Sequence, residues 1–166
     1  MSIISKLTSS QAPRAVLLIR LMAGGVFFFE GVQKFLYAES LGAGRFAKIG
    51  ILAPELMGPF VGGVEVLCGL LVVLGLFTRL ATLPLLLTIS VAILSTKVPI
   101  LLGHGFWTFT LTKLPRYGVL SMLHEARTDF SMLLGGLFLL IVGGGTWSLD
   151  ARLGKRRGEP RNERKP

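Results

Sequence analysis

Four apolar stretches, each close to the length of a membrane-crossing helix, constrain the fold more than any other feature of the sequence. A bilayer core about 30 Å thick needs roughly 20 apolar residues in helical form. The stretches are long and continuously apolar, which favours helices over the short alternating strands of a barrel. We therefore expect an all-α membrane four-helix bundle with helices over four ranges: 15–37, 56–77, 80–102 and 128–147.

The composition also points to lipid. Hydrophobic residues make up 51% of the chain and charged residues 16%, whereas soluble domains carry about 25% charged residues. Much of the net charge of +9 lies in a short tail after the last apolar stretch. No nucleic-acid recognition motif accompanies this charge, so we expect no nucleic acid as partner and the lipid bilayer instead. The basic residues of the tail are Arg152, Lys155, Arg156, Arg157, Arg161, Arg164 and Lys165.

Hydropathy divides the chain into three parts. A polar N-terminus covers residues 1–13, the spanning domain covers 14–150, and a basic tail over 151–166 has the composition of a disordered segment. Only Thr78 and Arg79 separate the second and third stretches, which predicts a tight antiparallel hairpin with its turn at these residues.

The topology follows from the number of spans and the placement of positive charge. An even number of spans puts both termini on one side of the membrane. Lys and Arg are more numerous on that side than in the opposite loops. The positive-inside rule therefore predicts a plasma (inner) membrane protein with both termini in the cytoplasm, N-in and C-in.

The loop over residues 103–127 is rich in aromatic residues, among them Trp107 and Tyr117. Such side chains favour the membrane–water interface, so we expect part of this loop to lie at the membrane surface or to dip into it. Two histidines, His104 and His124, are 20 residues apart without a metal-ligand spacing, and one cysteine, Cys68, lies in an apolar stretch. We predict no metal site.

Ionisable residues inside the apolar stretches are the best candidates for function. Arg, Lys or Asp at the middle of a membrane costs about 2.5–3.5 kcal/mol, so each needs a partner, water or a ligand. These residues are Arg20, Glu30 and Lys34 in the first stretch, Glu65 in the second and Asp129 at the start of the fourth.

Helical geometry places these charges on faces that also carry small residues. At about 100° per residue, Arg20, Glu30 and Lys34 share one sector of the first helix. Small residues beside a charge allow helices to approach closely and hide the charge from lipid, so we expect these faces to point inward. The glycines concerned are Gly24 and Gly31 in the first helix, Gly58, Gly62 and Gly69 in the second, and Gly136 and Gly143 in the fourth.

Depth separates the charges into two levels. With a rise of about 1.5 Å per residue, Glu30, Lys34, Glu65 and Asp129 are expected to meet in the outer half of the bundle. Arg20 lies about 15 Å nearer the cytoplasm, where it would bind helix ends and the tail or form a second site.

Two interpretations of the outer cluster stay open. It can be a set of salt bridges that fixes the helix register. It can instead be a functional site, because three carboxylates facing one lysine in a low dielectric favour a proton on one of them. Such a site suits proton transfer or a cationic or hydrogen-bonding ligand.

Three stretches resemble the DoxX family of small four-helix membrane proteins: RLMAGGVFFFEGVQKF, GGVEVLCGLLVVLGLFTRLA and HEARTDFSMLLGGLFLLIVGGGTWSLD. The resemblance covers roughly residues 14–153. It implies a membrane subunit like that of a thiosulfate:quinone oxidoreductase, or a membrane partner in an oxidative-stress or thiol-redox complex. The family pattern marks Lys34, Glu65 and the Thr78–Arg79 turn, and implies no secure catalytic residue.

The leading hypothesis is therefore a membrane component, an oxidoreductase subunit, of a quinone- or thiol-linked redox system. The sequence has no cofactor-binding motif, so electron transfer would need a bound quinone or a partner subunit. A non-enzymatic scaffold that recruits soluble partners through the basic tail is the main alternative. A small transporter or proton pathway, built as a homo-oligomer, is the third.

Overall fold

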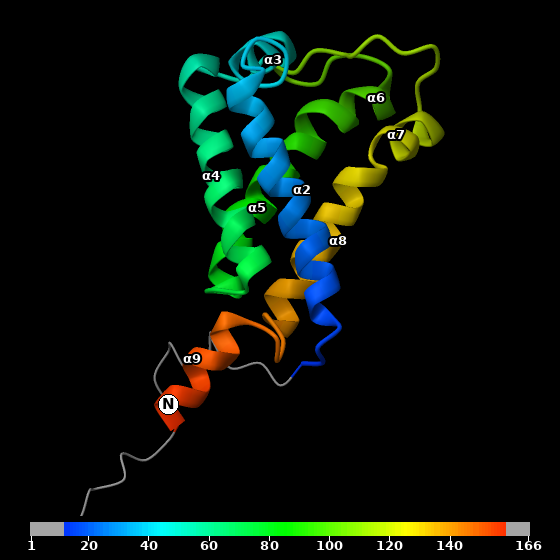
Figure 1. Ribbon diagram of the computed structural model, residues 1–166. Helices are drawn as coiled ribbons and strands as arrows, with labels where there is room; N and C mark the ends of the chain where they lie inside the picture. Colours follow the sequence, from blue (N-terminus) through cyan, green and yellow to red (C-terminus); the bar gives the residue numbers. More distant parts are fainter. Residues whose placement is uncertain (1–11, 159–166) are drawn as a thin grey trace, which may run out of the picture.

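The computed structural model describes residues 12–158, which are helical throughout apart from the connecting loops. Within this part of the chain there is no strand, only an isolated bridge between Phe106 and Phe109. The long helices lie side by side, and both ends of the described chain lie at the same end of the bundle (Figure 1). The prediction of an all-α fold is confirmed.

Three helical segments are long and apolar enough to cross a membrane. They are α2 (Val16–Leu36), α4 (Pro54–Leu74) and a continuous run of 25 residues from Thr78 to Leu102. The run consists of α5 (Thr78–Ala92), the π-helical turn η1 (Ile93–Lys97) and α6 (Val98–Leu102). These three segments begin and end within a few residues of the first three predicted ranges.

The fourth predicted range is helical over a shorter length. Helix α8 (Arg127–Val142) has 16 residues and follows the short helix α7 (Val119–Glu125). It ends five residues before the predicted boundary because three glycines follow it, and Gly143 and Gly145 have left-handed φ angles of +83° and +75°. Helix α8 packs against α5 and α2.

The closest helix pair is α2 with α4, and glycines make it possible. A Cβ atom added to Gly31 would lie 2.7 Å from the carbonyl oxygen of Gly62, and one added to Gly69 would lie 2.7 Å from the backbone nitrogen of Phe28. Such backbone-to-backbone approach is typical of small residues at membrane helix interfaces. The predicted inward face of α4 is confirmed, since its buried residues include Gly58, Gly62, Glu65 and Gly69.

The hairpin between α4 and α5 turns three residues earlier than predicted. Helix α4 ends at Leu74 because Gly75 adopts a left-handed φ of +69°, and α5 begins at Thr78. Thr78 and Arg79 are therefore the first residues of α5 and do not form the turn. Hydropathy continues unchanged through this turn, so it did not reveal where the helix ends.

The predicted disordered tail is wrong for residues 151–158, which belong to helix α9 (Leu149–Gly158). Ser148 caps this helix: its Oγ accepts a hydrogen bond from the Ala151 backbone N–H at 3.1 Å. Residues 159–166 of the predicted tail lie outside the described chain.

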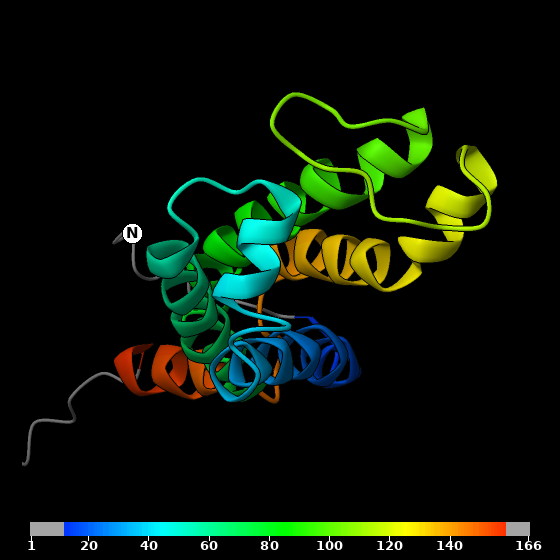
Figure 2. The same ribbon diagram turned by 90° about the horizontal axis from the view of Figure 1, so that it is seen from above.

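The opposite end of the bundle is covered by α3 (Ala43–Ile49) and the loop that follows α6. The Thr110 hydroxyl donates to the Lys48 carbonyl at 2.6 Å, and the Thr110 backbone N–H donates to the Ile49 carbonyl at 3.2 Å. Figure 2 shows this loop and α3 from above. We call this the α3 end of the molecule, and the end that holds Arg20, α9 and the described chain ends the Arg20 end.

Candidate functional site

A buried ion pair joins the two most closely packed helices. Lys34 Nζ of α2 lies 2.6 Å from Glu65 Oε2 of α4, and the side chains are 11% and 5% exposed. At 2.6 Å the Lys34 ammonium is within hydrogen-bonding distance of Oε2, which makes it the charged partner of this buried carboxylate. An opposite charge at this distance in a low dielectric compensates each ion for lost hydration. The oxygen nevertheless keeps a lone pair that can accept a proton or hydrogen bond.

Glu30 connects this pair to the helix surface. Its Oε2 lies 3.9 Å from Lys34 Nζ, one helical turn away, and its side chain is 45% exposed. Lys34 Nζ also donates to the Glu30 carbonyl at 3.5 Å. Lys34 thus lies between the buried carboxylate of Glu65 and the half-exposed carboxylate of Glu30. Three of the four predicted cluster members are therefore in contact.

The structure gives Asp129, the fourth predicted member, a different partner. Its Oδ2 lies 3.4 Å from Lys97 Nζ, and both side chains are largely buried at 18% and 12% exposure. The charged neighbours of Glu65 are Lys34 and Glu30. The predicted single cluster is thus two ion pairs, one between α2 and α4 and one between η1 and α8.

Lys97 lies inside the predicted range 80–102, but the sequence interpretation did not include it among the buried charges. It ends the π-helical turn η1, which contains the buried Ser95 and Thr96. The cause of the turn is Pro99, whose ring cannot donate a hydrogen bond to the Ser95 carbonyl and would clash with it in a regular helix. The Thr96 hydroxyl donates to the Ala92 carbonyl at 2.7 Å, which satisfies one of the displaced acceptors. π-Helical turns are frequent at functional sites.

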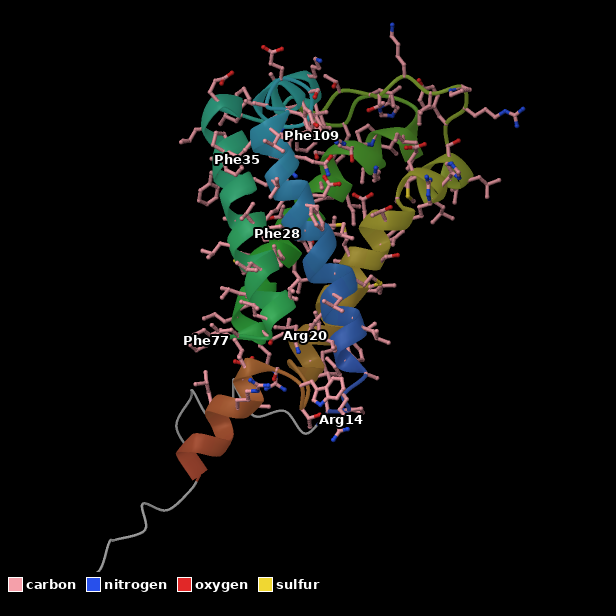
Figure 3. The ribbon with its side chains drawn as sticks, in the orientation of Figure 1. Arg14, Arg20, Phe28, Phe35, Phe77 and Phe109 are labelled. Atoms are coloured by element: carbon pink, nitrogen blue, oxygen red, sulfur yellow. The ribbon has the colours of Figure 1, made fainter. Side chains whose placement is uncertain are left out.

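Arg20 belongs to a second polar centre near the other end of the bundle. Figure 3 places it near Phe77 and far from Phe35 and Phe109. The side chain is only 2% exposed, and it donates to backbone carbonyls, two in the last turn of α4 and two in the loop between α8 and α9. The negative end of a helix dipole favours a cation there. Arg20 bonds the carbonyls of Val72 at 2.9 Å, Val73 at 2.5 Å, Gly144 at 3.1 Å and Trp147 at 2.6 Å.

Asp150, also missed by the sequence interpretation, completes this second centre. It is 1% exposed, and its carboxylate accepts hydrogen bonds from the first residues of α5. Gly75 lies between the two groups, because a Cβ atom there would come within 2.5 Å of the Arg20 guanidinium carbon. The signal that could have identified Asp150 is its position two residues after the capping Ser148. The hydrogen bonds of Arg20 and Asp150 join the α4–α5 hairpin to the segment that follows α8, which is structural chemistry.

Neither centre has the composition of a metal site. Within residues 12–158, no three His, Cys, Asp or Glu side chains gather closely enough to hold a metal ion. His104 and His124 are exposed, and Cys68 is a free thiol in α4. The carboxyl and ammonium groups of Glu30, Lys34 and Glu65 instead offer hydrogen-bond acceptors and donors.

Two hollows of the surface lie toward the α3 end. One of about 440 Å³ follows the end of α2 from Phe35 to Ser40. The other, of about 450 Å³, lies beside α7.

Comparisons with known proteins agree with this architecture. Residues 15–98 match the model of the DoxX family. An uncharacterized membrane protein of Mycobacterium tuberculosis is 48% identical over 151 residues, covering 91% of this chain and 88% of the relative. A Bacillus subtilis protein named "Putative oxidoreductase CatD" is 29% identical over 144 residues, covering 86% of this chain and 90% of that protein. No solved structure matches the chain significantly.

Proposed function

The chain belongs to the DoxX family of membrane proteins, and we propose that it is the membrane component of a quinone- or thiol-linked redox system. The observation that carries this proposal is the Lys34–Glu65 ion pair, buried between two membrane-length helices. The printed name of the Bacillus subtilis relative supports the redox assignment.

Proton handling is the chemistry that these residues supply. Reduction of a quinone consumes two electrons and two protons, and the electrons come from a partner protein because the sequence has no cofactor-binding motif. Glu30, half-exposed, takes up a proton at the helix surface, and Glu65 passes one on inside the bundle. Lys34 keeps its positive charge, holds both carboxylates close and attracts an anionic oxygen of the substrate. Asp129, paired with Lys97, serves as a second proton-binding group.

The second part of the proposal concerns orientation in the membrane. We place the protein in the plasma membrane with the Arg20 end in the cytoplasm and the α3 end outside. The basic residues Arg14, Arg79 and Arg152 lie at the Arg20 end, which supports this orientation by the positive-inside rule. Two fusion proteins test this orientation with a reporter that folds only in the cytoplasm. One carries the reporter after residue 166 and the other carries it after residue 112. Activity only in the second fusion would reverse the orientation.

The redox proposal is tested with charge-neutral variants. Glu65→Gln and Lys34→Gln each leave a buried charge unpaired, whereas the double variant removes both charges and restores the balance. If the ion pair had only a structural role, the double variant would regain both stability and activity. Our proposal predicts that it regains stability while quinone reduction in nanodiscs, with the native electron-donating partner, falls at least tenfold.

The matched control is Glu55→Gln, the same change in the same helix at an exposed position. It should leave the rate within twofold of the wild type. Full quinone reduction and full resistance to oxidative and thiol stress in the stable double variant would overturn the proposal.

A non-enzymatic scaffold is the second candidate, because α9 is a basic helix fixed to the bundle by Asp150. Such a helix can present a defined surface to a soluble partner. Loss of co-purifying proteins on deleting residues 152–166, with the Lys34–Glu65 double variant fully active, would favour the scaffold.

A further inference from the structure

Helix α7 has seven residues, and none of them is buried. Val119, Leu120 and Leu123 are 58%, 84% and 46% exposed. At about 100° per residue these three side chains share one face of the helix. Ser121 and Glu125 occupy the opposite face and His124 lies at the boundary beside Leu120, so α7 is amphipathic with its apolar face uncovered.

The level of α7 in the molecule matches the edge of a bilayer core. Helix α8 ends beside Arg20, which bonds the Gly144 carbonyl, and its 16 residues rise about 24 Å from there. Helix α2 rises by about the same distance from Arg20 to Leu36, where it ends. The junction of α7 and α8 therefore lies toward the same end of the bundle as the end of α2 (Figure 1).

Aromatic side chains mark the same level. Tyr37 and Tyr117 are 57% and 42% exposed at the α3 end, and Trp147 is 57% exposed at the Arg20 end. Trp and Tyr gather at both membrane–water interfaces. An apolar helix face between such residues and the acyl chains fits lipid better than water.

The hollow beside α7 has the chemistry of a phospholipid site. Apolar side chains of Leu114, Pro115 and Leu120 form one part of its wall. The polar part of the lining consists of Arg116, Ser121, His124 and the carboxylate of Glu125. Arg127 lies at the next turn and donates to the His124 carbonyl. An acyl chain beside the apolar wall and a phosphate near Arg116 would satisfy both parts.

We propose that α7 is an interfacial helix, with Leu120 inserted among the acyl chains of the leaflet at the α3 end and Arg116 and His124 binding the phosphate of a phospholipid there. We assign lipid rather than protein as the partner of this apolar face, because the face lies beside the lipid-facing surfaces of the long helices. The bound headgroup holds the loop over 103–118 and the start of α8 at a fixed depth.

Spin-label accessibility tests the depth of the helix. Cys68→Ala gives a background without cysteine, into which Leu120→Cys, Ser121→Cys and the lipid-facing reference Leu87→Cys are introduced one at a time. In phospholipid nanodiscs, a nitroxide at position 120 should respond to oxygen several-fold more than to a water-soluble nickel chelate, as at position 87. The label at position 121 should respond less to oxygen. Nickel access at position 120 equal to that at position 121 would overturn the proposal and favour a soluble protein partner.

Thermal shifts test the headgroup contact. Adding phosphatidylglycerol to protein in detergent should raise the Tm of the wild type and of the control Lys113→Ala, which lies in the same loop outside the hollow. The rise should be at least halved in Arg116→Ala. An equal rise in Arg116→Ala, or an equal rise on adding inorganic phosphate alone, would refute a phospholipid site at Arg116.

Discussion

The carboxylate of Asp150 caps the helix that begins at Thr78, 72 residues earlier in the chain. Its Oδ2 accepts hydrogen bonds from the Thr78 backbone N–H and hydroxyl, each at 2.9 Å, and its Oδ1 accepts from the Phe77 N–H at 2.7 Å. A carboxylate at the start of a helix satisfies donors that have no partner within the helix and faces the positive end of its dipole. Asp150 thus ties α9 to the α4–α5 hairpin.

Asp150→Ala should lower the free energy of unfolding by about 1–3 kcal/mol, because it leaves buried donors of Phe77 and Thr78 unsatisfied. Denaturation by SDS, followed by circular dichroism in mixed micelles, measures the loss. Arg152→Ala, two residues away and exposed, is the control and should change stability by less than about 0.5 kcal/mol. Equal stability of the two variants would show that the cap contributes nothing.

Arg20→Lys should destabilise the protein despite keeping the charge. With four hydrogen bonds the planar guanidinium joins the carboxyl end of α4 to the loop between α8 and α9, whereas an ammonium is a single point donor. We expect a loss of more than about 2 kcal/mol in the same assay, since hydrogen bonds to charged groups contribute about 1.5–3 kcal/mol each. A Lys variant as stable as the wild type would mean that charge alone matters here.

The glycines of α2 should differ sharply in their tolerance of a methyl group. Gly31→Ala places a Cβ atom 2.7 Å from the Gly62 carbonyl oxygen and should cost about 1–3 kcal/mol by forcing α2 and α4 apart. Gly25→Ala, in the same helix, meets no atom within 4 Å and should be neutral or slightly stabilising. Thermal unfolding of both variants in one detergent measures the effect. Close packing of α2 and α4 requires Gly31→Ala to have a lower Tm than Gly25→Ala.

The two buried ion pairs should behave independently. Lys34→Gln combined with Glu65→Gln should show a coupling free energy above about 1 kcal/mol, because the two groups are in contact. Lys34→Gln combined with Asp129→Asn should be additive within about 0.5 kcal/mol, since Asp129 pairs with Lys97. Strong coupling between Lys34→Gln and Asp129→Asn would instead support the single cluster that the sequence predicts.

Much of the helical layout follows from the sequence because length and hydropathy determine it. The ranges 15–37 and 56–77 differ by at most three residues from α2 and α4. The inward face of α4 was also predictable, since glycines on both sides of Glu65 are spaced so that they share its face of the helix. The helix ends were not, because Gly75 and Gly143 stop their helices by backbone conformation while the surrounding residues stay apolar.

The partners of the charges were less predictable than their presence. Lys34 and Glu30 are four residues apart, so their contact follows from helix geometry. Lys97 did not stand out, because its burial depends on the wide turn before Pro99 and on the position of α8. Asp150 was predicted only as the last residue of the spanning domain, because composition alone does not reveal a hydrogen bond to a helix 72 residues away.

The bonds of Arg20 have a consequence for how the protein is made. Its acceptors at Gly144 and Trp147 lie 124 and 127 residues later in the chain, so they do not exist when the first helix enters the membrane. Until the ribosome has produced them, this guanidinium has only α4 or lipid headgroups to bind. The bonds that join Arg20 to the loop between α8 and α9 can therefore form only when synthesis is nearly complete, and a chain cut before residue 144 leaves the arginine without two of its four acceptors.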